Sequence, residues 1–76
     1  MLRMNEIKQE GNKITCRVFP ENKENRAFHM SIDATTLEYE CEGREHDDYS
    51  GMALGKIMDY LDEGKELPEE AYSYWY

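Results

Sequence analysis

The apolar and polar positions of residues 5–19 form two strand-like runs, and this pattern predicts a β-hairpin. The dipeptide Gly11-Asn12 lies in the middle and suits a two-residue hairpin loop. Closing the chain there gives each residue one cross-strand neighbour. The expected neighbours are Glu10 with Lys13, Ile7 with Cys16 and Glu6 with Arg17. The same register puts two polar side chains, Gln9 and Asn5, on the apolar face, which is typical of a polar edge strand.

Two runs of strict alternation, residues 28–33 and 37–42, predict a second hairpin. A turn at Ala34-Thr35, or a four-residue loop over residues 33–36, gives the same register. We then expect Ile32 opposite Leu37, Met30 opposite Tyr39, Phe28 opposite Cys41 and, on the other face, His29 opposite Glu40. Residues 20–26 are polar and should form a surface loop between the hairpins.

The period changes to that of a helix after Asp48, which predicts a main helix over residues 49–63. Its apolar stripe consists of Leu54, Ile57, Met58 and Leu61. Asp47, Asp48 or Ser50 can act as the N-cap, and Gly64 stands where a C′ glycine belongs. Gly51 and Gly55 share one helix face, so we expect the helix backbone to pack closely there.

The C-terminal segment predicts a second, short helix over residues 68–75. Pro68 suits the first helical position, and two glutamates follow it in the first turn, where negative charge favours the helix dipole. A helix of this length is unstable alone. We therefore expect Tyr72 and Trp75 to dock it on the rest of the chain.

These elements together predict one α+β domain spanning residues 1–76. Its antiparallel meander has four strands, and the main helix and the short C-terminal helix cover one face. The opposite face should be solvated, and its side chains are Thr15, Arg17, His29, Ser31, Glu38, Glu40 and Glu42.

The composition of the chain excludes several classes of protein. The chain of 76 residues has 17 acidic and 9 basic side chains, a net charge of −8. Its nine aromatics and clear periodicity favour a folded chain over a disordered one. No apolar run approaches the roughly 18 residues of a membrane span, and the N-terminus lacks the apolar region of a signal peptide. We expect a cytoplasmic protein with reduced cysteines.

The charge is distributed unevenly. Residues 1–34 hold six basic and five acidic side chains, a net of +1, whereas residues 35–76 hold three basic and twelve acidic ones, a net of −9. Direct binding of nucleic acid needs clustered basic residues, and the helices have the opposite sign. The pattern favours a basic protein partner, although a negative surface also serves solubility alone.

Candidate chemistry is sparse. The acidic run of residues 42–48 matches no metal-binding motif, and its aspartates suit helix capping. The predicted strands point Cys16 and Cys41 to the apolar face and His29 away from it, so a cysteine–histidine pair would need Cys41 and His46. We expect no metal, no cofactor and no catalysis.

The aromatic C-terminus is the strongest candidate for a contact surface, because tyrosine and tryptophan are enriched at protein interfaces. The predicted partner-binding residues are Tyr72, Tyr74, Trp75 and Tyr76, with the helix carboxylates Asp59, Asp62 and Glu63. We expect a non-catalytic interaction domain that binds another protein or a second copy of itself. The alternative is an acidic inhibitor or nucleic-acid mimic, of the antitoxin or anti-defence type, that binds a basic protein.

Overall fold

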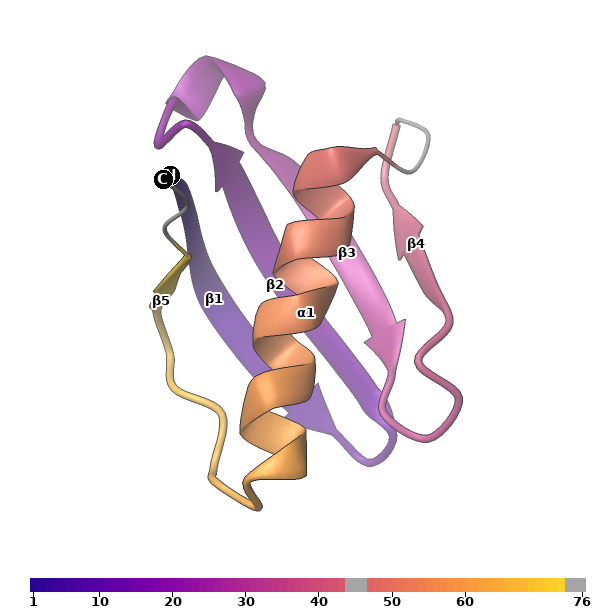
Figure 1. Ribbon diagram of the computed structural model, residues 1–76. Helices are drawn as coiled ribbons and strands as arrows, with labels where there is room; N and C mark the ends of the chain where they lie inside the picture. The colour runs from indigo at the N-terminus through magenta and orange to yellow at the C-terminus, as the bar shows by residue number, and fades with distance from the viewer. Residues whose placement is uncertain (44–46, 74–76) are drawn as a thin grey trace.

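The computed structural model describes residues 1–43 and 47–73 as a five-stranded antiparallel sheet with one helix packed on it (Figure 1). The elements are β1 (Leu2–Glu10), β2 (Lys13–Pro20), the 3-10 turn η1 (Glu24–Arg26), β3 (Phe28–Asp33), β4 (Tyr39–Cys41), α1 (Asp48–Asp62) and β5 (Ala71–Ser73). The strand order is β4-β3-β2-β1-β5. The predicted α+β fold is confirmed, with one strand more than the expected meander. No helix in the described ranges is long and apolar enough to cross a membrane.

The first hairpin pairs as predicted near its turn but not further out. Glu10 faces Lys13 and Gln9 faces Ile14, as expected, whereas the predicted pairs Ile7–Cys16 and Glu6–Arg17 are wrong, and the observed outer pairs are Asn5–Arg17 and Met4–Val18. The register shifts between Asn5 and Lys8. An extra residue in one strand of an antiparallel pair is a β-bulge, which moves every later side chain to the other face.

This bulge improves the core. Glu6 takes a positive φ of 52° at the irregularity. Beyond it, Leu2 and Met4 point to the core face and are fully buried, while Asn5 points to the opposite face beside Arg17. The polar residue that the predicted register put among the apolar side chains is thereby removed from the core.

The second hairpin is displaced by two residues from the predicted register. The observed pairs are Ile32–Tyr39, Ser31–Glu40 and Met30–Cys41, so the predicted pairs of Leu37 with Ile32 and of His29 with Glu40 are wrong. The Asp33 carboxylate accepts hydrogen bonds from the backbone N–H groups of Thr35 and Thr36, and the Leu37 N–H donates to the Asp33 carbonyl. The loop therefore extends to Leu37. A shift of two leaves each strand residue on its predicted face.

The helix begins and ends within one residue of the predicted positions. Asp47 is the N-cap and forms a reciprocal capping box with Ser50, and Gly64 follows the helix with a φ of 68°. Gly51 and Gly55 are both exposed, and a Cβ built on either would have no neighbour within 4 Å. The expected close packing at these glycines is wrong.

The predicted C-terminal helix is also wrong, because the described part of this segment forms β5. Its residues pair with β1 as Leu2–Ser73, Arg3–Tyr72 and Met4–Ala71. The N–H of Ile7 also donates to the carbonyl of Glu69, 3.2 Å away. The free edge of β1 supplies hydrogen bonds along the segment, whereas so short a helix is unstable alone. The expected docking of Trp75 lies outside the described residues.

The core lies between α1 and one face of the sheet. Its buried side chains are Leu2, Met4, Ile7, Ile14, Cys16, Val18, Phe28, Met30, Ile32, Ala53, Ile57 and Ala71. The helix contacts mainly β1, β2 and β5. Figure 1 shows it crossing the sheet diagonally, from the top of β3 and β4 to the bottom of β1. The loop between β3 and β4 therefore lies away from the end of the helix.

We predict that Ala71→Asp lowers the free energy of unfolding by about 2–4 kcal/mol, because it puts a carboxylate into the core. Tyr72→Asp is the matched control, since Tyr72 is in the same strand but 38% exposed on the other face. Urea unfolding followed by circular dichroism measures both. Equal losses would contradict the placement of β5.

Candidate functional site

The predicted partner-binding residues that the structure describes lie on two different surfaces. Asp59, Asp62 and Glu63 are exposed at the C-terminal end of α1. Ala71 points into the core beneath α1, so Tyr72, the next residue of β5, lies on the opposite face of the sheet. Tyr74, Trp75 and Tyr76 are outside the described residues. Tyr72 and the three helix carboxylates therefore do not form one surface.

The face of the sheet turned away from α1, here called the open face, has separated charges. Its basic side chains are Arg3, Lys8, Lys13 and Arg17, all on β1 and β2. Its acidic side chains on the other half are Asp33 on β3, Glu40 on β4 and, flanking β4 at the same parity, Glu38 and Glu42. Glu10, at the turn of the first hairpin, is the exception on the basic half.

One end of the open face is closed by its own side chains. Phe19 is only 1% exposed there, because the Arg3 guanidinium stacks over its ring at 4.1 Å and that of Arg17 at 5.0 Å. Glu70 lies 3.9 Å from Arg3 and accepts a hydrogen bond of 2.9 Å from the Tyr72 hydroxyl. This burial was missed from the sequence, although the spacing of Arg17 and Phe19 puts them on one strand face.

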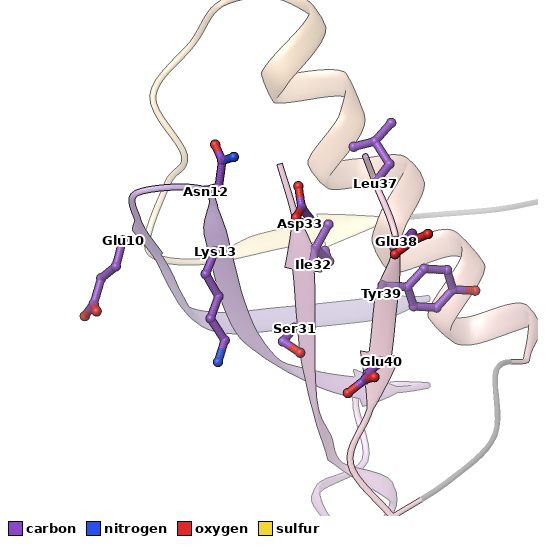
Figure 2. Close-up of a pocket in the computed structure, with 10 residues that line it drawn as sticks. All are labelled: Glu10, Asn12, Lys13, Ser31, Ile32, Asp33, Leu37, Glu38, Tyr39 and Glu40. Atoms are coloured by element: carbon purple, nitrogen blue, oxygen red, sulfur yellow. The ribbon is translucent and has the colours of Figure 1, made fainter. Parts of the chain in front are cut away.

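The other end of the open face is hollow. A groove of about 760 Å³ crosses the sheet beside the β3–β4 loop, and its lining residues come from three places. Figure 2 shows Glu10, Asn12 and Lys13 on one side, Ser31, Ile32 and Asp33 in the middle, and Leu37, Glu38, Tyr39 and Glu40 on the other side. The volume is in the range of known ligand pockets.

Leu37 is the unusual residue of this groove. Its φ is +65°, a left-handed conformation that costs a residue with a Cβ roughly 1–2 kcal/mol. It is half-buried, yet it is not among the side chains that pack on the core. Backbone strain of this kind accumulates at binding and catalytic sites. The sequence placed Leu37 in the core, because a period-two pattern does not distinguish a strand from a loop that continues its alternation.

The groove is negatively charged. It has four carboxylates, those of Glu10, Asp33, Glu38 and Glu40, against the single ammonium of Lys13. The backbone N–H groups of Thr36 and Thr35 hold the pKa of the Asp33 carboxyl below its ordinary value, so this group stays ionised at neutral pH. Carboxylates next to the apolar surface of Leu37 can bind a cationic group that carries a hydrocarbon stem.

Among the described residues, those suited to catalysis lie apart. Cys16 is buried, and its burial raises the pKa of the thiol to about 12, so it is not a nucleophile at neutral pH. His29 is exposed on the open face, on the other side of the sheet. The expected pair of Cys41 with His46 involves a residue outside the described ones. Within residues 1–43 and 47–73, no group of three His, Cys, Asp or Glu side chains is arranged to hold a metal ion.

No protein family model, no curated protein and no solved structure matches this chain. The function is therefore inferred from the geometry of the groove and of the open face.

We predict that the stability of the chain depends on the ionisation of Asp33. Because the pKa of this carboxyl is lowered on folding, its contribution is present above the unfolded-state pKa and is lost as the pH falls through the folded-state pKa. In Asp33→Asn, the free energy of unfolding should fall less steeply over this acidic range. Urea unfolding at a series of pH values measures the slopes, and parallel slopes would contradict the role of the loop hydrogen bonds.

Proposed function

We propose that the chain is a small, non-catalytic protein-interaction domain of the cytoplasm, and that its groove binds a positively charged segment of a partner protein. The observation that carries this proposal is the position of Leu37. A large apolar side chain is held in a strained conformation, away from the core, in a groove that four carboxylates also line. Backbone strain of this kind is concentrated at binding sites, which supports the proposal.

The charge and the apolar surface of the groove indicate which kind of partner it can bind. The aliphatic part of a lysine or arginine can lie on Leu37 while its charged end approaches a carboxylate that lines the groove. A charged rim around an apolar contact is also the common anatomy of protein interfaces. An open groove bordered by a strand suits an extended segment better than a compact small molecule.

The absence of catalysis and the cytoplasmic location remain parts of the proposal. The raised pKa of Cys16 argues against a nucleophilic thiol. Both cysteines are free, and β3 separates them, since Cys16 and Cys41 each face Met30 from opposite sides. Unbridged cysteines are the ordinary state in a reducing compartment.

The acidic end of α1 is the competing surface for the same partner. Asp59, Asp62 and Glu63 form it, and the aromatic C-terminus was expected to complete it. Of the aromatic residues predicted to bind the partner, the structure describes Tyr72. It lies on the open face, away from the helix carboxylates. The groove is the better candidate because it combines charge with apolar surface.

A second candidate function, the nucleic-acid mimic, is favoured by a separate observation. Glu38, Glu40 and Glu42 are exposed at every second position along β4 and its flanks, which forms a row of carboxylates about 7 Å apart. A regular row of negative charges resembles a phosphate backbone. Such a row would bind a basic protein without needing Leu37.

We predict that Leu37→Asn weakens binding of a fluorescein-labelled peptide of alternating lysine and leucine by at least about tenfold, as loss of a central interface residue does. Asparagine tolerates a positive φ, so the variant should be as stable as the parent or up to about 1 kcal/mol more stable. Fluorescence anisotropy and urea unfolding measure the two effects. Met52→Gln, which alters a half-buried apolar side chain on α1, is the control and should leave binding unchanged.

The carboxylates are tested by two matched pairs, each removing two negative charges. Glu38→Gln with Glu40→Gln should weaken binding of the same peptide, whereas Asp59→Asn with Asp62→Asn should not. The reverse result would transfer the site to α1. If the parent chain does not bind the peptide, the proposed function is wrong.

A lysine–serine peptide of the same length and charge separates the two candidate functions. A binding groove should prefer the lysine–leucine peptide, and Leu37→Asn should remove that preference. A nucleic-acid mimic should bind both peptides equally, with affinity that falls steeply with salt and does not change in Leu37→Asn. Equal binding would therefore support the mimic and contradict the groove.

A further inference from the structure

The separation of charge on the open face makes that face complementary to itself. The half formed by β1 and β2 has four basic side chains, Arg3, Lys8, Lys13 and Arg17, against the acidic Glu10 and, next to Arg3 at the flank of β5, Glu70. The half formed by β3, β4 and the flanks of β4 has four acidic side chains and, among the described residues, His29 but no lysine or arginine. Opposite charges on two halves of one surface can pair across a symmetric dimer.

We infer that a second copy of this chain binds the open face, in a two-fold symmetric dimer with the two sheets face to face. The axis runs parallel to the strands, between β2 and β3, in the plane of the interface. Rotation about it carries the acidic half of one copy over the basic half of the other. An axis perpendicular to the strands would instead bring acidic half over acidic half, so the charges select one arrangement.

The register of the sheet identifies the contacts. Glu40 faces Ser31, Ser31 faces Thr15, and Thr15 faces Lys8, so these four residues form one straight row across the open face. The rotation superposes the row on itself in reverse, which puts Glu40 over Lys8 of the second copy and Ser31 over its Thr15.

The neighbouring row consists of Glu10, Lys13, Asp33 and Glu38. Its reversal puts Asp33 over Lys13 of the second copy, and it puts Glu38 over Glu10, which is a like-charge contact at the edge of the interface. The short hydroxyl side chains of Ser31 and Thr15 in the centre allow the two sheets to approach closely.

The size of the face suits a dimer. The two larger dimensions of the molecule are 30 Å and 26 Å. A surface of this extent approaches the roughly 800 Å² per partner that specific interfaces bury. The net charge of −8 opposes association, but at 0.1 M salt it is screened beyond about 10 Å, while pairs in contact are screened much less.

This inference does not depend on the proposed function. The dimer uses the charged rows of the open face and does not need Leu37. Both occupants contact Glu40, so a basic partner segment and a second copy should compete. Leu37→Asn should therefore weaken peptide binding without weakening the dimer, which separates a failure of one proposal from a failure of the other.

The test is sedimentation velocity of the full chain in 0.1 M salt, at concentrations from micromolar to millimolar. The parent should dimerise. Glu40→Lys and Lys8→Glu should each weaken dimerisation at least about tenfold, because each homodimer then has two like-charge contacts. An equimolar mixture of the two variants should restore the dimer, since lysine at position 40 in one copy then meets glutamate at position 8 in the other.

Asp59→Lys and Lys65→Glu make the same charge changes on exposed positions of the helical layer and should leave the dimer unchanged. A chain that stays monomeric up to millimolar concentration would overturn the inference. It would also be overturned by a dimer that Glu40→Lys leaves intact, or by a mixture of the two variants that stays monomeric.

Discussion

The structure depends on one contact, the packing of a single helix against a single face of the sheet. Ser50, Ala53 and Ile57 are fully buried in this contact. The small side chains of Ser50 and Ala53 let the helix approach the strands closely. The larger side chain of Ile57 is also buried between the helix and the sheet. A helix of 15 residues is about 22 Å long, which is too short to cover five strands along their whole length. Its diagonal course therefore determines which parts of the sheet are covered and which remain accessible.

Both surfaces proposed for binding exist because α1 covers only part of the sheet. The helix ends near β1, so the β3–β4 loop lies away from it, and Leu37 is left outside the core next to the groove. On the open face, no apolar layer is needed, and the strands can carry charge. The bulge in β1 determines which charges these are, because it directs Arg3 to the open face, where it stacks on Phe19. The packing of α1 on one face of the sheet thus affects the core, the groove and the charged face.

The sequence predicted the two hairpins and the main helix well. It predicted the register of the strands and the position of the groove less well. Periods of two and of 3.6 are local signals, and they located two hairpins and α1, with Asp47 and Gly64 at the helix ends. They also put Glu38 and Glu40 on the solvated face. The bulge at Glu6 could not be predicted, because one extra residue does not visibly change the apolar–polar pattern of so short a strand. Leu37 was assigned to the core, since the loop continues the alternation of the strand. The groove was therefore missed.

By itself, the sequence determined the two hairpins and α1 and which side of each is apolar, because neighbouring residues decide both. Tertiary structure decided which segments meet. Pro68 and the glutamates after it favour a helix locally, yet the segment becomes β5, because the free edge of β1, more than sixty residues away along the chain, satisfies its backbone hydrogen bonds. No local pattern near residue 70 records the existence of that edge. The same is true of the charged rows of the open face, which exist only once four strands are aligned.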